Sequence, residues 1–186
     1  MAVYESARVK MVENQLRANK VVDERLTEVM RKIERERFVP AAKRSVAYAD
    51  EALQIANGRW LMEPMLFARL SQLANVGSGD LVLVVGAGMG YGAAILASLA
   101  SAVVALEEDE NLAAAAGEAL AGLDGAADNV VVEQGVLNQG WPGQAPYDVI
   151  FVEGAVEGRP DSLLSQLADG GRLVVMEKTA SMVQRG

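Results

Sequence analysis

The sequence has no cysteine and no histidine among its 186 residues. Without cysteine the chain has no disulfide, no thiolate nucleophile and no thiolate metal ligand. Without histidine, His-based catalytic triads and the common zinc, copper and iron ligand sets are excluded as well, and we expect no metal site. Any chemistry must therefore come from carboxylates, hydroxyls, lysine, arginine, backbone amides or a bound cofactor.

Long apolar runs are also lacking. No stretch approaches the roughly 20 residues that a bilayer span needs, and the N-terminus has no apolar segment typical of a signal peptide. The net charge is −8, and nothing in the sequence resembles a nucleic-acid-binding module. We expect a cytoplasmic protein with neither membrane nor nucleic acid as partner. With 51% hydrophobic and 23% charged residues, the chain suits one globular domain over residues 1–186.

Residues 1–76 are predicted to form a helical N-terminal segment on the substrate side of the molecule. Ser6 can cap a first helix and Asp23 a second, which should end before Pro40. Irregular chain should follow, and Pro64 suits the first turn of a third helix. The apolar positions expected to face the core at helical spacing are Val9, Val12 and Leu16, then Leu26, Met30 and Ile33, then Phe67, Leu70 and Leu73.

Residues 77–186 show a different pattern, in which short apolar runs alternate with helical segments. The predicted strands are 81–85, 102–107, 129–134, 147–152 and 172–177, and the predicted helices are 91–99, 109–120 and one that begins at Pro160. Such alternation is typical of a Rossmann-like α/β fold with a parallel, doubly wound sheet. We expect this part to be the cofactor-binding core.

A glycine-rich loop directly follows the first predicted strand and opens a predicted helix. Gly86, Ala87, Gly88 and Gly90 let the backbone turn sharply and approach a ligand closely. Glu107 ends the next strand, where an acidic side chain can accept both hydrogen bonds of a ribose diol. The spacing G-x-G-x-G departs from the dinucleotide fingerprint, which disfavours an NAD-type oxidoreductase. A tighter loop without a pyrophosphate cradle suits S-adenosylmethionine.

Several longer stretches together resemble the protein-L-isoaspartate O-methyltransferase family. They are MVENQLRANKVVDERLTEVMRKIERERFVP (11–40), AYADEALQIANG (47–58), LVLVVGAGMGYGAAILA (81–97), GWPGQAPYDVIFVEGA (140–155) and LLSQLADGGRLV (163–174). The resemblance implies a Rossmann-like S-adenosylmethionine-dependent methyltransferase fold. It also implies protein repair, in which a methyl group moves to the carboxylate of an isoaspartyl residue in a protein or peptide. A carboxylate is ionised at pH 7, so this reaction needs no histidine base.

The resemblance also identifies substituted site positions. Trp60 and Met62 stand where the family carries hydroxyl side chains that serve the substrate, so the catalytic residues are unknown. Val84 and Val136 stand where it carries acids that bind the cofactor. The expected cofactor-binding residues are Gly86, Ala87, Gly88, Gly90, Glu107 and Val136. We expect weak or absent cofactor binding and little methyl transfer. The alternative is a catalytically inactive scaffold that binds a protein partner or another nucleoside ligand.

Four residues near the expected site are also considered for other roles. Trp60 and Trp141 are expected to be packing residues. Arg59 is either a surface residue or a partner for a substrate carboxylate, and Glu153 could replace a lost cofactor-binding acid. The resemblance implies strands beyond residue 177 that complete the sheet, and we expect these strands to be missing here. We therefore expect either a longer natural chain or a homodimer that covers the sheet edge.

Overall fold

The computed structural model describes residues 2–123, 125 and 127–178. The α-helices and β-strands, in chain order, are α1 (Ala2–Lys10), α2 (Glu24–Lys32), β1 (Leu53–Ala56), β2 (Arg59–Leu61), α3 (Pro64–Ala74), β3 (Leu81–Val85), α4 (Tyr91–Ala97), β4 (Ala102–Glu107), α5 (Glu110–Ala121), β5 (Val130–Gln134), β6 (Tyr147–Val156), α6 (Asp161–Leu164) and β7 (Leu167–Glu177). A π-helical turn (Met11–Leu16) continues α1, and short 3-10 helices include Arg35–Phe38, Ala41–Val46, Leu137–Gln139 and Pro142–Gln144.

The core is a five-stranded sheet with the strand order β5-β4-β3-β6-β7, and all neighbouring strands are parallel. The predicted α/β class is confirmed. Val82 and Val84 of β3 belong to one buried hydrophobic cluster, whereas Leu83 and Val85 belong to another on the opposite face. An unbroken apolar run forms this strand because both of its faces are covered.

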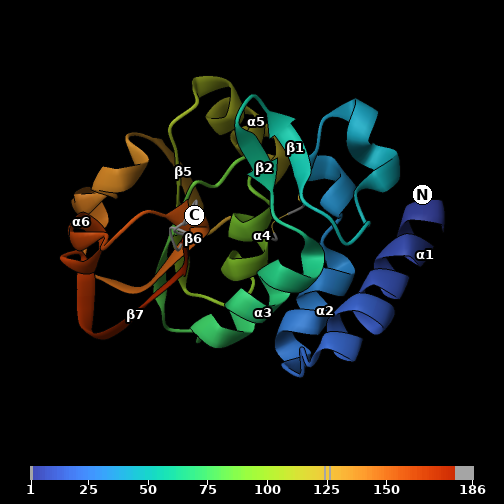
Figure 1. The fold of residues 1–186 in the computed structure, drawn as a ribbon, viewed down its shortest axis with the longest axis horizontal. Helices are drawn as coiled ribbons and strands as arrows, with labels where there is room; N and C mark the ends of the chain where they lie inside the picture. The colour runs from blue at the N-terminus through green and yellow to red at the C-terminus, as the bar shows by residue number, and fades with distance from the viewer. Residues whose placement is uncertain (1, 124, 126, 179–186) are drawn as a thin grey trace, which may run out of the picture.

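Helices lie on both sides of the sheet. Figure 1 shows α3 and α4 between the strands and the N-terminal helices α1 and α2, with α6 on the other side of the strands. The opposite face packs against Leu163 of α6 and against Leu137 and Trp141 in the segment between β5 and β6. The N-terminal helices therefore pack on α3 and α4, on the same face of the sheet.

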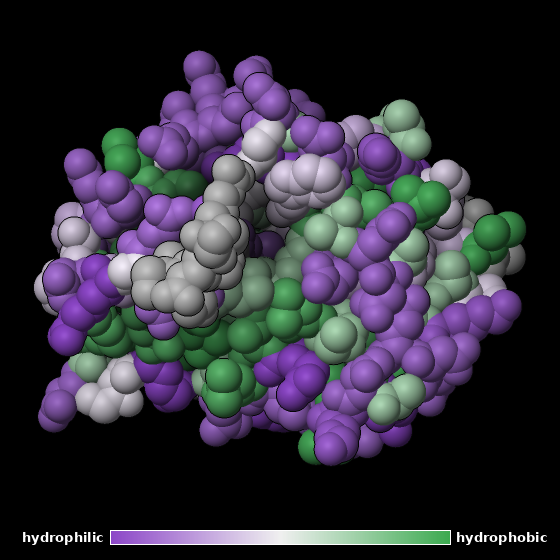
Figure 2. Space-filling view, viewed as in Figure 1, coloured by the Kyte–Doolittle hydropathy of each residue, from purple (hydrophilic) through white to green (hydrophobic). Residues whose placement is uncertain are grey.

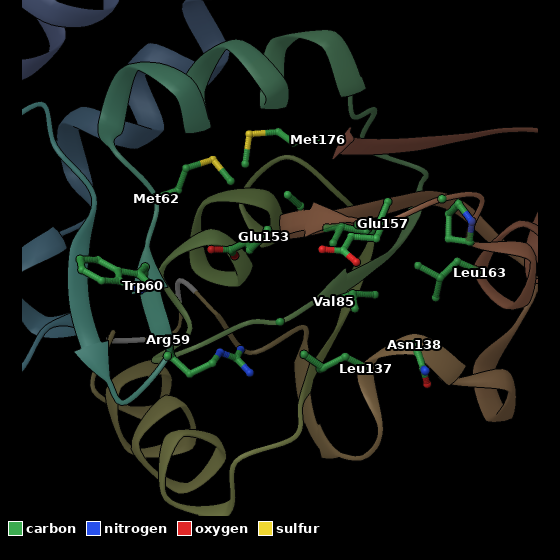
Figure 3. Close-up of a pocket in the computed structure, with 18 of the residues that line it drawn as sticks. Arg59, Trp60, Met62, Val85, Leu137, Asn138, Glu153, Glu157, Leu163 and Met176 are labelled. Carbon is green, nitrogen blue, oxygen red and sulfur yellow. The ribbon is translucent and has the colours of Figure 1, made fainter. Parts of the chain in front are cut away.

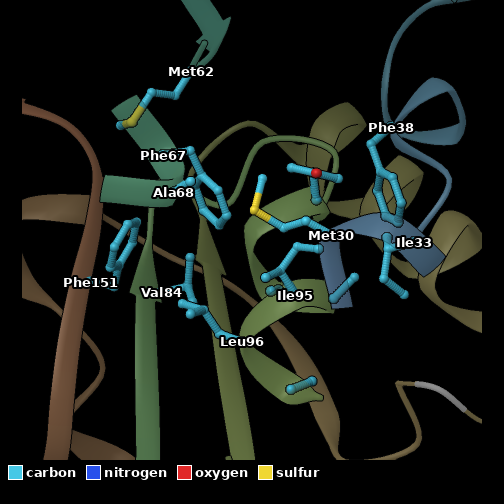
Figure 4. Packing of buried hydrophobic residues seen from close by; sticks show 14 of the residues in the cluster. Met30, Ile33, Phe38, Met62, Phe67, Ala68, Val84, Ile95, Leu96 and Phe151 are labelled. Atoms are coloured by element: carbon cyan, nitrogen blue, oxygen red, sulfur yellow. The ribbon is translucent and has the colours of Figure 1, made fainter. Parts of the chain in front are cut away.

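A chain of aromatic rings joins the N-terminal segment to the sheet. Phe38 and Phe67 each lie 5.6 Å, between ring centroids, from Tyr91 of α4, and Phe67 lies 5.6 Å from Phe151 of β6. Figure 4 shows Phe67, Val84 and Phe151 meeting between α3 and the sheet. Such tilted and edge-on pairs stabilise the packing beyond the area they bury. They hold the helices at a fixed distance from the strand ends.

The three central strands reach one edge of the sheet in register, and β6 continues beyond it to Val156. Val85, the last residue of β3, pairs with Leu106 of β4 on one side and with Val152 of β6 on the other. The next residues of these two neighbours are Glu107 and Glu153, so both carboxyl groups are placed beside the glycine loop. In open α/β sheets this carboxyl edge is where ligands bind.

The N-terminal caps follow the prediction in one helix and not in the other. Asp23 accepts hydrogen bonds from the backbone amides of Arg25 and Leu26, as predicted for the cap of α2. Ser6 is not a cap, because α1 begins at Ala2 and Ser6 lies inside the helix. Val9, expected in the core, is 37% exposed.

The segment after α2 is more ordered than predicted. Helix α2 ends at Lys32, and a 3-10 helix separates it from Pro40. The predicted irregular chain contains an antiparallel hairpin, β1–β2, which turns at Asn57-Gly58, with Gly58 at φ +69°. Asn-Gly between two apolar runs is a strong local hairpin signal, and the prediction overlooked it.

The outer side of α3 remains exposed. Phe67 is buried as predicted, but Leu73 is 71% exposed. Figure 2 shows hydrophobic side chains gathered on this face of the molecule. Helical spacing indicated that Leu73 shares a stripe with Phe67, but not how far the neighbouring elements extend over it. None of the helices in the described ranges has the length and hydropathy that a membrane span requires.

Helix α5, which follows Glu107, should depend on its N-cap. Asp109 accepts hydrogen bonds from the amides of Asn111 and Leu112, at 2.9 and 3.0 Å. We expect Asp109→Ala to lower the free energy of unfolding by about 1 kcal/mol, because these amides lose their acceptor. Asp109→Asn, the matched control, should retain most of it. Urea denaturation checks this, and an equal loss in both variants would contradict the capping role.

Candidate functional site

The glycine loop folds tightly over the end of β4. The backbone amides of Gly86 and Ala87 both donate to the carbonyl oxygen of Leu106, at 2.9 and 3.1 Å. Gly86, Gly88 and Gly90 have φ of +80°, +57° and +93°, a region that L side chains rarely adopt. These glycines are therefore required by the backbone path itself. The path leaves Gly86 facing the space above the sheet edge.

Glu107 is fully buried, and its carboxylate binds four hydrogen-bond donors. Oε1 accepts from the backbone amides of Glu108 and Asp109, at 2.9 and 3.0 Å. Oε2 accepts from the amide of Gly88 at 2.7 Å and from the Nη2 atom of Arg59 at 2.5 Å. A carboxylate offers about four lone-pair sites, so these donors saturate it. The buried charge is thereby compensated.

A cleft of about 830 Å³ opens at the carboxyl ends of β3 and β6. The hairpin and the start of α3 form one wall, and the chain after β5 forms another (Figure 3). Its lining residues include Arg59, Trp60, Met62, Val85, Gly86, Leu137, Asn138, Val152, Glu153, Leu163 and Met176. The lining is mostly apolar with a few charged groups, as is usual for small-molecule sites.

A buried arginine fixes the wall that the hairpin forms. Arg35 is fully buried and donates from Nε to the carbonyl oxygen of Ala47 at 2.7 Å and from Nη2 to that of Met62 at 2.6 Å. Its guanidinium carbon lies 4.7 Å from the centre of the Tyr91 ring. Burial lowers the pKa of Arg35 and raises that of Tyr91. Arg35 thus ties both ends of the 47–62 segment to one point in the core.

Comparison with known proteins identifies the family. A sequence model described as "Protein-L-isoaspartate(D-aspartate) O-methyltransferase (PCMT)" matches residues 6–185. The chain belongs to this family. A protein-L-isoaspartate O-methyltransferase 2 of an Anaeromyxobacter species is 42% identical over 180 residues, which cover 97% of this chain and 73% of that protein. A protein-L-isoaspartate O-methyltransferase 1 of Rhodopseudomonas palustris is 39% identical, covering 98% and 74%.

Solved structures agree with this assignment. A protein-L-isoaspartate O-methyltransferase that is 27% identical superposes with a TM-score of 0.78 over 91% of this chain, and this chain spans 55% of that one. A putative family member from Plasmodium falciparum, crystallised with S-adenosyl-L-homocysteine, is 21% identical and also has a TM-score of 0.78, covering 96% of this chain and 85% of that one. The predicted methyltransferase fold is confirmed.

Two positions that the family resemblance assigns to substrate hydroxyls lie on the hairpin side of the cleft. Trp60 lines the cleft and is 55% exposed, so the expectation that it is a packing residue is wrong. Met62 is 7% exposed, and Figure 3 shows its side chain near that of Met176. Trp141, by contrast, packs beside Gly135 on the other face of the sheet, as expected.

The expected cofactor-binding residues are only partly brought together. Gly86 lines the cleft, and Gly88 lies beside it through its bond to Glu107. Val136 is 45% exposed, and the cleft is lined by the following residues, Leu137 and Asn138. The backbone turns into a 3-10 helix at Leu137, which presents that side chain to the cleft. Sequence position alone did not indicate this turn.

Arg59 and Glu153 are the site residues that sequence reasoning left undecided. Arg59 is not a free surface residue, because its side chain is 22% exposed and pairs with Glu107. Glu153 lines the cleft, but its Oε1 atom is buried and has no hydrogen-bond partner within the described part of the chain. A Cβ atom at Gly92 would lie 1.9 Å from that oxygen, so the carboxyl group needs the glycine beside it.

Burial raises the pKa of Glu153 from 4.5 to about 8, and Glu107 contributes in the same direction. Arg35 and Arg59 oppose this shift with their positive charges. The folded state therefore binds a proton that the unfolded state releases between these pH values. The contribution of Glu153 to the free energy of unfolding is therefore fully present below pH 4.5, and it is lost as the pH rises toward 8.

This shift predicts the pH dependence of a neutral variant. Glu153→Gln should gain stability relative to the original protein as pH rises from 5 to 8, because Gln has no charge to desolvate. The relative gain in Tm should be about 3 °C or more. Thermal unfolding at several pH values checks this, with Glu157→Gln at the exposed rim as control. A difference in Tm that does not change with pH would contradict the buried, protonated state.

Proposed function

We propose that this chain is an S-adenosylmethionine-dependent carboxyl methyltransferase that acts on isoaspartyl residues of proteins or peptides. Family membership supports the reaction type, since relatives about 40% identical bear this name. The observation that carries the proposal is the meeting of the glycine loop, Glu107 and the cleft at one sheet edge.

The residues of the cleft fit the proposed cofactor. Glu107 supplies a carboxylate that can accept hydrogen bonds from ribose hydroxyls, at the end of β4. Gly86 presents no side chain toward the cleft, and Val85, Leu137 and Val152 form apolar walls suited to an adenine ring. When bound, the cofactor supplies a sulfonium methyl group. The cleft volume of about 830 Å³ lies within the usual range for cofactor sites.

The work of the protein in this reaction is positioning. The substrate carboxylate is already ionised at neutral pH, so no side chain has to remove a proton. The hairpin and the start of α3 hold one wall of the cleft in place, and the apolar lining excludes water. Holding the carboxylate oxygen in line with the methyl group can lower the barrier by several kcal/mol. The absence of histidine and cysteine from the sequence is compatible with this chemistry.

A methyl-transfer assay tests the proposal. We expect the protein to transfer labelled methyl groups slowly from S-adenosylmethionine to an isoaspartyl peptide and to form a base-labile ester. The same peptide with an ordinary aspartyl residue is the matched control and should remain unlabelled. Cofactor binding without transfer to the isoaspartyl peptide would reject this substrate and favour a scaffold that only binds ligands.

We further propose that Trp60 and Met62 slow this reaction, because an indole and a thioether replace small hydroxyl groups at the substrate wall. Trp60→Thr should raise kcat/KM for the isoaspartyl peptide several-fold, since it widens the cleft and restores a donor and acceptor. Val22→Thr, which changes a residue 74% exposed and outside the cleft lining, is the control and should have no effect. A lower kcat/KM for Trp60→Thr would show instead that the indole binds the substrate.

A further inference from the structure

The ion pair between Arg59 and Glu107 blocks the acceptor that the ribose would use. All four lone-pair sites of the Glu107 carboxylate are filled, three of them by backbone amides. Those amides belong to the glycine loop and to the turn into α5, and their positions are fixed by the main chain. Arg59 is the donor that side-chain rotation alone can remove. A ribose diol therefore reaches Glu107 only if Arg59 leaves.

The guanidinium lies between the cleft and Glu107. A Cβ atom at Gly86 would lie 3.5 Å from Nη2 of Arg59, and one at Gly88 would lie 2.8 Å from Cδ1 of Ile55. The hairpin thus covers the glycine loop with two side chains. Figure 3 shows Arg59 extending from the hairpin across the cleft toward Leu137. Its side chain occupies the route by which a ligand would approach the acid.

A released guanidinium would need another anion. Among the cleft-lining residues that the structure describes, the cations are Arg59 and Arg159, and Arg159 pairs with Asp161 at the exposed rim. Arg59 is next to Trp60, on the wall that faces the substrate. The substrate of the proposed reaction brings a carboxylate into this cleft, and a carboxylate taken out of water requires a partner. An arginine can bind it with two parallel hydrogen bonds.

We propose that Arg59 exchanges one carboxylate for another during binding. Arg59 pairs with Glu107 until the ribose hydroxyls of the cofactor donate to that carboxylate in its place. Arg59 then pairs with the carboxylate of the substrate. This inference rests on the proposed function, because it needs a ribose-containing cofactor and an anionic substrate. Arg59 is on this account a substrate-positioning residue whose release is coupled to cofactor binding.

Calorimetric titration with S-adenosylhomocysteine tests the first half. This ligand has no sulfonium charge, so simple repulsion by Arg59 does not enter. We expect Arg59→Gln to bind it about 10- to 100-fold more tightly than the original protein, because no charged contact has to be broken. Arg44→Gln is the control, since it removes an exposed cation that lies outside the cleft lining. Its affinity should be unchanged.

A second pair of ligands ties the effect to the ribose. The gain in Arg59→Gln should also appear with adenosine and should vanish with 2′,3′-dideoxyadenosine, which lacks the diol. Arg59→Lys, which keeps the charge, should bind with intermediate affinity and remains a test if Arg59→Gln folds poorly. Equal or weaker binding of S-adenosylhomocysteine by both Arg59 variants would overturn the exchange.

The substrate tests the second half. At saturating cofactor, Arg59→Gln should raise KM for the isoaspartyl peptide at least tenfold, although it binds the cofactor more tightly. If Arg59 had only a structural role, Arg59→Gln would weaken the binding of both the cofactor and the peptide. An unchanged KM for the peptide would overturn the pairing of Arg59 with the substrate. If no variant binds S-adenosylhomocysteine at millimolar concentration, the cofactor assignment itself is wrong, and the exchange is wrong with it. Binding without tightening in the Arg59 variants rejects the exchange alone.

Discussion

The candidate site depends on one buried carboxylate. Glu107 cannot remain charged and out of water without strong partners, and it recruits them from three separate parts of the chain. The glycine loop, the turn into α5 and the hairpin each donate to it. Their relative positions are therefore set by a single group. The same group is the acceptor proposed for the cofactor. The Glu107 carboxylate therefore serves both the stability of the fold and the binding of the ligand.

The N-terminal segment provides the second support of the cleft. The aromatic chain from Phe38 to Phe151 sets the distance between the helices and the sheet. Arg35 fixes the hairpin segment through its hydrogen bonds to the carbonyl groups at the two ends of that segment. Glu153 lies next to this group, and burial raises the pKa of its carboxyl group to about 8, which disfavours a second buried negative charge beside Glu107. The cleft thus lies between a rigid sheet edge and a wall attached by a few polar contacts.

The sequence was informative where the signal is local. The strands 81–85 and 102–107 were predicted with their observed bounds, because apolar runs buried on both faces leave little ambiguity. The role of Asp23 as the N-cap of α2 was likewise predicted from the residues that follow it in the sequence. The pairing of Arg59 with Glu107 joins residues 48 positions apart, and no local pattern indicates it. The sequence also did not show that Leu137, rather than Val136, lines the cleft, because this depends on the backbone turn at Leu137.

The attachment of the hairpin segment at both ends limits how it can move. Arg35 holds the carbonyl groups of Ala47 and Met62 together, so both ends of the chain between them are fixed by one side chain. Ile55 and Arg59 lie on this chain, one on each strand of the hairpin, and both side chains cover the glycine loop. With the strands held in this way, rotation of the Arg59 side chain frees Glu107 while Ile55 stays over Gly88. Access to the acid and access to the loop backbone are then two separate events.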